Sequence, residues 1–220
     1  MDTFIKNCTA AILAGGENRR MPVLKAFIDV EGRKIIEINL GTVKRLFEEV
    51  FIVTDRPEAC LYLGVPMLGD VYDIRGPMTG IFTSLLNSSK QWVFISACDM
   101  PFLNKDLIEY MASKRDNSDA VVPVKKGNTE PLFAFYSKRL LASMEKSILA
   151  DKRGIKEFLS DKRVQYIRTP EIKKRDPGAR SFINLNTPED IDLYLQPQDK
   201  TKFKNESARR EKCLVLEQQN

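Results

Sequence analysis

The stretch AAILAGGENRRMPVLK, residues 10–25, begins with a short apolar run and continues into a loop with two glycines and several basic residues. A compact apolar run that stops at Gly15 and Gly16 is typical of a buried strand followed by a tight loop. Glycines let backbone N–H groups approach phosphate oxygens, because no Cβ stands in the way. Arg19 and Lys25 add positive charge to this loop. The stretch therefore predicts a strand ending in a phosphate-binding loop, with a plain tight turn as the alternative.

After this loop, short apolar runs alternate with longer amphipathic ones. Runs of β-branched and aromatic residues predict strands, and apolar residues at helical spacing predict helices. The predicted strands are residues 10–13, 50–53, 65–68, 92–97, 120–124, 132–136, 164–167 and 182–185. The predicted helices are residues 34–47, 79–86, 105–111 (capped by Asn104), 138–148, 155–159 and a last one opening at 187–190. This alternation predicts an α/β fold, a Rossmann-like three-layer sandwich whose mainly parallel sheet has helices on both faces.

The composition is that of an ordinary globular protein, with 43% hydrophobic and 30% charged residues in a chain of 220. We predict a single nucleotide-binding domain over residues 1–195 and a polar C-terminal extension over residues 196–220, where the alternation of elements stops. No apolar run approaches the roughly 20 residues that span a bilayer, so we expect no membrane association. The first residues lead into the glycine loop rather than into a cleavage site, which argues against a signal peptide. We expect a cytoplasmic protein.

Residue counts also limit the chemistry. The chain has no histidine, which excludes a Ser-His-Asp triad and histidine metal sites. Its four cysteines are scattered without a CxxC pair, so neither a zinc cage nor a disulfide framework is indicated. Any metal must then be held by carboxylates and phosphates, which favours Mg²⁺. The net charge of +5 suits an anionic ligand, whereas nucleic acid is not favoured because aromatic residues are not interleaved with the basic ones.

Two acidic residues follow predicted strands. Asp99 ends a buried run in FISACDMPF, and Asp70 closes VPMLGD. The ligand of a parallel α/β sheet lies beyond the carboxyl ends of its strands, where both carboxylates would stand. Asp99 is suited to hold Mg²⁺, with capping of the next helix as the alternative. Asp70 is suited to contact a nucleotide sugar or a second metal, with a plain turn residue as the alternative.

Two further segments carry polar groups that could line the predicted ligand site at the carboxyl ends of the strands. GPMTG, residues 76–80, precedes a predicted helix, and backbone N–H groups at such a helix start can bind an anion or a base edge. Asn184 and Asn186 in FINLNTPED lie two residues apart, so their side chains share one face of an extended segment. They can bind a polar ligand or simply cap the following helix.

Five motifs, LAGG…RM…K, GPMTG, ACDMPF, EPLFAFY and NLNTPED, occur in this order between about Thr9 and Leu195. Together they resemble the MobA-type molybdenum cofactor guanylyltransferases, a group of nucleotidyltransferases. The resemblance implies a Rossmann-like sheet and the transfer of GMP from Mg²⁺-GTP to the molybdopterin cofactor, with release of pyrophosphate. It also implies GTP and molybdopterin cofactor as partners, with a molybdoenzyme or its chaperone receiving the product. We expect a monomer or weak oligomer.

The resemblance assigns roles to residues of the predicted cleft. It implies that Lys25 contacts the nucleotide and that Asp99 is the metal ligand; we predict catalytic roles for both and, from the positive charge of the loop, for Arg19. With Gly16 added from the glycine loop itself, the predicted contacts to the nucleotide or the acceptor are Leu13, Ala14, Gly15, Gly16, Lys25, Asp55, Asp70, Asp99, Asn184 and Asn186. Asn184 and Asn186 are the candidates on the acceptor side.

The phosphate loop departs from the family pattern at Pro22 and at Leu24, and it is slightly shorter than in that pattern. Pro22 stands where the family has glycine, so a backbone N–H donor is missing there. Two alternatives therefore stay open. One is a related nucleotidyltransferase of the cytidylyl or sugar-phosphate type, against which the Gly15-Gly16 pair favours the guanylyl type. The other is a non-catalytic nucleotide-binding adaptor.

Overall fold

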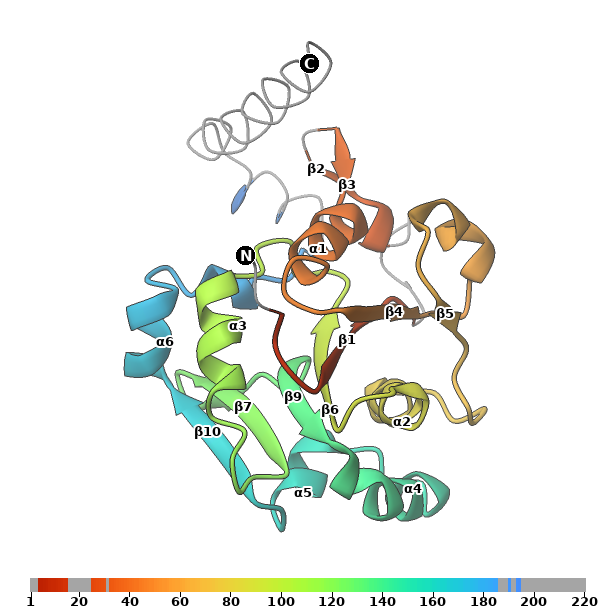
Figure 1. Cartoon of the computed structure of the whole chain (residues 1–220), viewed down its shortest axis with the longest axis vertical. Coiled ribbons are helices and arrows are strands. Elements are labelled where there is room, and N and C mark those ends of the chain that lie inside the picture. Colours follow the sequence, from red (N-terminus) through yellow and green to blue (C-terminus); the bar gives the residue numbers. More distant parts are fainter. Residues whose placement is uncertain (1–3, 16–24, 31, 186–189, 191–192, 195–220) are drawn as a thin grey trace.

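The computed structural model describes residues 4–15, 25–30, 32–185, 190 and 193–194 (Figure 1). Residues 187–189, where we predict a last helix to open, and the predicted extension over residues 196–220 lie outside this part. The strands are β1 (Cys8–Leu13), β2 (Asp29–Val30), β3 (Arg33–Lys34), β4 (Glu49–Val53), β5 (Met67–Leu68), β6 (Trp92–Ala97), β7 (Ala120–Lys125), β8 (Asn128–Thr129), β9 (Phe133–Ser137) and β10 (Val164–Arg168). The α-helices are α1 (Ile35–Val43), α2 (Pro77–Asn87), α3 (Lys105–Ala112), α4 (Leu141–Leu149), α5 (Ile155–Leu159) and α6 (Thr169–Arg175). The 3-10 helices are η1 (Lys25–Phe27), η2 (Pro57–Leu63), η3 (Lys138–Leu140) and η4 (Arg180–Phe182).

The main sheet has the strand order β10-β7-β9-β6-β1-β4-β5, with β8 paired to β7. Strand β1 pairs in parallel with both β4 and β6, whereas β9 runs antiparallel to its neighbours β6 and β7. The chain moves outward from β1 to β4 and β5, then returns to place β6 on the other side of β1. The prediction of a mainly parallel sheet is confirmed, and β1 is the point where the strand order reverses.

Alternate residues of each strand face two different layers of helices. Ala10 and Ile12 of β1 pack with α1, α3 and α6, while Ala11 packs with α2, α4 and α5. The central strands are therefore apolar on both faces, as expected for strands covered on both sides. Figure 1 shows the two groups of helices on opposite sides of the sheet. This confirms the predicted three-layer α/β sandwich.

Aromatic rings fill the layer beneath α1 and α3. The ring of Phe94 on β6 stacks on Phe47 at 5.6 Å, lies 4.9 Å from Phe135, and meets Phe133 edge-on at 5.3 Å. Phe133 in turn meets the ring of Phe182 at 5.2 Å. Offset-stacked and edge-on pairs add to the free energy gained by burying the rings. The cluster thereby ties the central strand β6 to the loop after α1 and to η4.

Two predicted elements differ from the structure, and several observed elements were not predicted. The predicted strand 182–185 is wrong: η4 ends at Phe182, and the Leu185 N–H donates to the Asp99 carbonyl at 2.9 Å instead of entering a sheet. The predicted helix 34–47 ends at Val43, after which the chain turns through 3-10-type bonds such as Leu46 N–H to Val43 O at 2.9 Å. The β2–β3 hairpin, β8, η2 and α6 were not predicted. Asn104 is confirmed as the cap of α3, because its Oδ1 accepts the Leu107 N–H at 2.9 Å.

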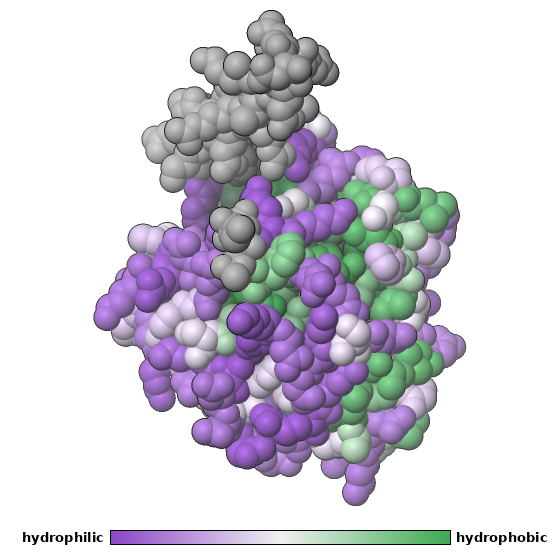
Figure 2. All heavy atoms as spheres, viewed as in Figure 1, coloured by the Kyte–Doolittle hydropathy of each residue, from purple (hydrophilic) through white to green (hydrophobic). Residues whose placement is uncertain are grey.

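The surface is mostly polar, and apolar side chains gather at the edge that carries β5 and α2 (Figure 2). Leu61, Val71 and Leu86 are among the exposed apolar residues. Singly exposed apolar side chains are normal in globular proteins. Of the helices that the structure describes, none combines the length and the apolar character required to cross a membrane.

Asp119, just before β7, joins the outer strand β10 to the sheet. It is 8% exposed, and its carboxylate accepts hydrogen bonds from Arg163 Nε at 3.1 Å and Nη2 at 3.0 Å and from Arg139 Nε at 2.9 Å. Arg139 also donates to the Ser118 carbonyl. The hydrogen bonds from Arg163, helped by those from Arg139, hold the pKa of Asp119 below its ordinary value of 3.8 despite its burial. The ionised form therefore stabilises the fold.

We expect Asp119→Ala to lower the free energy of unfolding at pH 7 by about 2 kcal/mol, less than for a fully buried pair because both arginines are largely exposed. Because the folded-state pKa is depressed, this contribution is present above the unfolded-state pKa and is lost as the pH falls through the folded-state value. Urea unfolding at pH 7 and pH 3 checks this, and the gap between wild type and variant should narrow at pH 3. Asp116→Ala, which removes an exposed carboxylate nearby, should change neither value. An equal gap at both pH values would contradict the assignment.

Candidate active site

A cleft of about 880 Å³ lies at the carboxyl ends of the parallel strands. Residues from the ends of β1, β4 and β6 line it, and so do residues from the loop before α2. This is the edge where the strand order reverses at β1, the position at which open α/β sheets bind their ligands. Seven of the predicted site residues line this cleft: Leu13, Ala14, Gly15, Asp55, Asp70, Asp99 and Asn184.

Backbone hydrogen bonds hold the strand ends together at the floor of the cleft. The Ala14 N–H donates to Val53 O at 2.8 Å, and the Cys98 N–H donates to Leu13 O at 3.0 Å. The Thr54 hydroxyl donates to Ala14 O at 3.4 Å, which joins β4 to the start of the phosphate loop. A Cβ on Gly15 would stand 4.0 Å from the backbone nitrogen of Asp55. The first loop and the end of β4 therefore lie side by side.

Helix α2 closes the cleft on the side of β4 and β5. A Cβ added at Gly80 would lie 3.3 Å from the Leu13 side chain and 3.8 Å from Asp70 Oδ1, so glycine keeps these three groups close. Asp70 also accepts a 3.5 Å hydrogen bond from the hydroxyl of Thr83, one turn further along α2. Gly76 caps the helix with φ 150° and ψ 160°, a conformation that is essentially restricted to glycine. The motif GPMTG thus shapes one wall of the cleft.

The Asp70 carboxyl is perturbed by its surroundings in the cleft. Burial raises the pKa of the Asp70 carboxyl, the Thr83 hydrogen bond lowers it, and the negative charge of Asp55 raises it further. The net result is a pKa above the ordinary value of 3.8. Perturbed carboxylates in a cleft are typical of functional sites.

Asp99 is held by contacts of the backbone around it. The Asn39 side chain on α1 donates to the Cys98 carbonyl at 3.3 Å, and the Leu185 N–H donates to the Asp99 carbonyl at 2.9 Å. These contacts fix the turn after β6 from two sides. They also bring the segment that carries Asn184 next to Asp99, although the two lie 85 positions apart in sequence.

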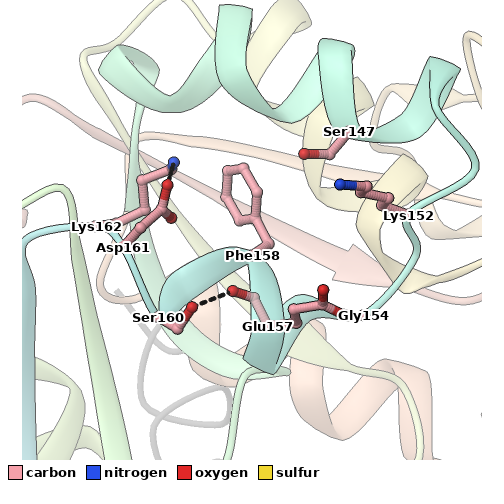
Figure 3. Close-up of a pocket in the computed structure, with 8 residues that line it drawn as sticks. All are labelled: Ser147, Lys152, Gly154, Glu157, Phe158, Ser160, Asp161 and Lys162. Carbon is pink, nitrogen blue, oxygen red and sulfur yellow. Dashed lines mark hydrogen bonds and ion pairs between the residues drawn. The ribbon is translucent and has the colours of Figure 1, made fainter.

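A second hollow of about 250 Å³ lies between α4 and α5 (Figure 3). Figure 3 shows the Phe158 ring between Lys162 and Asp161 on one side and Ser147 and Lys152 on the other. Lys162 and Asp161 are paired at 2.8 Å, so these charges already satisfy each other. The hollow is too small for a nucleotide and lies apart from the strand ends. The cleft is therefore the candidate active site.

Comparison with known proteins agrees with this geometry. Residues 10–167 match the family model described as the MobA-like NTP transferase domain. The chain belongs to the MobA-like NTP transferase family. A protein of Peptoclostridium acidaminophilum named a probable molybdenum cofactor guanylyltransferase is 36% identical over 195 residues, which cover 86% of this chain and 88% of that protein. The molybdenum cofactor guanylyltransferase of Desulfosudis oleivorans is 37% identical over 186 residues, covering 84% and 92%.

Solved structures give the same family and fold. Molybdopterin-guanine dinucleotide biosynthesis protein A from Archaeoglobus fulgidus superimposes with a TM-score of 0.76 at 26% identity, covering 87% of this chain and 99% of that one. CMP:2-keto-3-deoxy-manno-octonic acid synthetase superimposes with a TM-score of 0.67 over 88% of this chain and 99% of that one. Because its identity is only 11%, that similarity shows the shared fold alone.

Some predicted site residues of this MobA-like chain are not described. Gly16, Arg19 and Asn186 lie outside the described residues, and so does the side chain of Lys25. The backbone of Lys25 opens η1, and the next residue, Ala26, lines the cleft.

The cleft of the MobA-like chain also contains residues that sequence reasoning did not select. Arg75, Cys98 and Glu130 line it. Glu130 begins EPLFAFY, a motif noted only for its resemblance to the family. An acidic residue before proline at the start of a predicted strand was the available signal, but strand pairing was needed to show at which end of the sheet it stands.

Proposed function

We propose that this chain transfers GMP from GTP to the molybdenum–molybdopterin cofactor, giving the guanine dinucleotide form and pyrophosphate. The observation that carries the proposal is the gathering of the phosphate-loop start, Asp70 and Asp99 in one cleft at the switch point of a MobA-like sheet. The relatives compared above are named for guanylyl transfer to the molybdenum cofactor. We propose GTP and the molybdopterin cofactor as the substrates of this chain.

In the proposed reaction, an oxygen of the acceptor's terminal phosphate attacks the α-phosphorus of GTP. A new P–O bond forms as the bond from the α-phosphorus to the bridging oxygen breaks, and pyrophosphate leaves with that electron pair. The attacking phosphate is already anionic, so it needs no strong base, in keeping with a chain that lacks histidine. The protein acts by positioning the two substrates and by neutralising charge. We assign charge neutralisation to Lys25 and Arg19, and placement of the nucleotide to the Gly15 loop and Asp70.

The donor groups of the cleft fit Mg²⁺. Within the described residues, no three His, Cys, Asp or Glu side chains form a group that could hold a metal by themselves. Mg²⁺ is commonly held by one or two carboxylates together with substrate phosphates, which is the combination a nucleotide would complete here. Asp55, Asp70 and Asp99 line the same cleft, and their negative charges favour a cation there. We propose Asp99 as the ligand; the bound ion would supply charge neutralisation to the phosphates.

The state of the cysteines bears on the cellular compartment in which the protein works. No disulfide joins the three cysteines that the structure describes, and Cys8 and Cys60 are buried. Burial raises the pKa of the Cys8 thiol to about 12, which leaves it unreactive at neutral pH. We propose that the protein works in the cytoplasm.

The choice of nucleotide tests this proposal against the alternative of a related nucleotidyltransferase of the cytidylyl type. At a Mg²⁺-GTP concentration 100 times Kd, binding to the folded state should add about 2.7 kcal/mol, or roughly 5–10 °C in Tm. CTP at the same concentration should give a clearly smaller rise, measured by thermal unfolding. A larger rise with CTP would contradict guanylyl specificity. A rise with GTP but no pyrophosphate release in the presence of acceptor would favour the non-catalytic adaptor instead.

A further inference from the structure

Glu130 lines the cleft, and its carboxylate has no hydrogen-bond partner within the described part of the chain. The residue is half-buried. Within the same part of the chain, its side chain makes no ion pair either. Both carboxylate oxygens of this half-buried side chain are therefore free to accept hydrogen bonds from a ligand.

The backbone around Glu130 is anchored at several points. The Glu130 N–H donates to Pro123 O at 2.9 Å, and its carbonyl accepts the Phe133 N–H at 3.2 Å. The fully buried Tyr136 donates its hydroxyl to Pro131 O at 2.7 Å, and the next carbonyl, that of Leu132, accepts the Ala97 N–H at 2.9 Å. Each backbone group named here is paired while the Glu130 side chain is not. The segment therefore holds this carboxylate in place without satisfying it.

Other carboxylates of the chain show what a structural role looks like. Asp119 is surrounded by arginine donors, and Glu49 accepts from the hydroxyls of Thr9 at 2.8 Å and Ser89 at 2.6 Å. Hydrogen bonds lower the pKa of both, so these charges stabilise the fold. Burial instead raises the pKa of Glu130, although the positive charges of Lys125 and Lys156 oppose this. Its ionised form is thus a cost to the folded state, which binding of a ligand would offset.

Sheet topology places Glu130 on the far side of Asp99 from the nucleotide wall. Because β9 runs antiparallel to β6, the start of β9 stands at the carboxyl end of β6, with Ser96 opposite Phe133. Across this edge the order is β5 with Asp70, then β4, β1 with Gly15, β6 with Asp99, and finally the segment before β9 with Glu130. A nucleotide held between Gly15 and Asp70 therefore leaves the Glu130 end for the acceptor.

We propose that Glu130 is a specificity residue that binds the pyrimidine edge of the acceptor's pterin. This inference rests on the proposed function, which makes a pterin the acceptor. The 2-amino-4-oxopyrimidine ring presents a ring N–H and an exocyclic NH₂ side by side, and a carboxylate can accept from both with its two oxygens. Pro131 and Leu132, which line the cleft next to Glu130, offer an apolar surface to the flat ring.

Glu130→Gln tests the inference, because it keeps the shape but turns one acceptor oxygen into a donor. We expect KM for the molybdenum–molybdopterin cofactor to rise about 10- to 100-fold, the range for losing charged hydrogen bonds. KM for GTP should stay within about twofold. Glu130→Asp should recover part of the loss. If Glu130 stabilised the fold, the substitution Glu130→Gln would lower Tm. We expect instead that Tm of this variant is no lower than that of the wild type.

A binding measurement separates this inference from the proposed function. The probes are a phosphorylated pterin and the matching lumazine, in which a carbonyl replaces the 2-amino group. Wild type should prefer the pterin about 10-fold or more, and Glu130→Gln should lose the preference. Glu157→Gln, which neutralises an exposed carboxylate on α5, should keep it. This preference is measured without turnover, so it can hold even if the wild type fails to transfer GMP.

Three results would overturn the inference. One is wild type that fails to bind the pterin or does not prefer it over the lumazine. Another is Glu130→Gln that keeps the preference. The third concerns guanine, which carries the same 2-amino-4-oxopyrimidine edge: a rise in KM for GTP, together with a lost preference for GTP over inosine triphosphate, would show that Glu130 binds the donor base instead.

Discussion

Asp99→Ala is expected to reduce guanylyl transfer by about 1,000-fold or more while leaving the fold intact. Asp99 follows β6 and lines the cleft together with Gly15 and Asn184. We assign it to the metal that neutralises the phosphates, so its loss removes charge stabilisation from the reacting groups. The backbone contact of Asp99, which accepts the Leu185 N–H at 2.9 Å, does not depend on the side chain. Activity should therefore fall far more than stability.

Pyrophosphate release with GTP, Mg²⁺ and the molybdenum–molybdopterin cofactor measures this effect, and thermal unfolding without ligand measures the fold. Asp106→Ala, which removes an exposed carboxylate in the first turn of α3, is the matched control and should retain activity. Asp99→Ala with activity near that of wild type would remove Asp99 from the site. An equal loss in Asp106→Ala would show that net charge matters rather than position.

The sequence predicted the layers because they depend on local patterns. Apolar runs such as Trp92–Ala97 are buried on both faces, and apolar periodicity placed α1, α2, α3 and α4 with errors of a few residues at their ends. Helix α6 was missed although Thr169-Pro170-Glu171 repeats the sequence Thr-Pro-Glu of residues 187–189, where we predict a helix to open. At the start of α6 the Glu171 carboxylate accepts the Arg168 N–H at 2.9 Å.

The site could be predicted only where it followed from strand ends. Asp70 and Asp99 follow apolar runs, so the edge rule for parallel sheets placed both in the cleft. Glu130 stands before a strand rather than after one, and only the antiparallel pairing of β9 with β6 brings it to the same edge. The closeness of Asp99 to the Asn184 segment rests on one long-range backbone bond from Leu185. Contacts of this kind depend on tertiary pairing and leave no local pattern in the sequence.

Phe94→Ala is expected to lower the free energy of unfolding by about 3–5 kcal/mol. The ring is fully buried in the middle of β6, and it contacts Phe47, Phe133 and Phe135. Removing it forfeits the burial of the ring and leaves a cavity among rigid aromatic neighbours that cannot close in around it. Since domains are stable by only about 5–15 kcal/mol, this is a large fraction of the total.

Urea unfolding of Phe94→Ala should show a lower midpoint and an unchanged slope, since the surface exposed on unfolding is nearly the same. Leu149→Ala, which shortens a side chain that is 62% exposed at the end of α4, should stay within about 0.5 kcal/mol of wild type. At a temperature where Phe94→Ala is still folded, its KM for GTP should match that of wild type, because none of the described cleft-lining residues is an aromatic of this cluster. A loss below about 1 kcal/mol would mean that the neighbouring rings repack, and the cluster would then not be the rigid support of β6 that its geometry indicates.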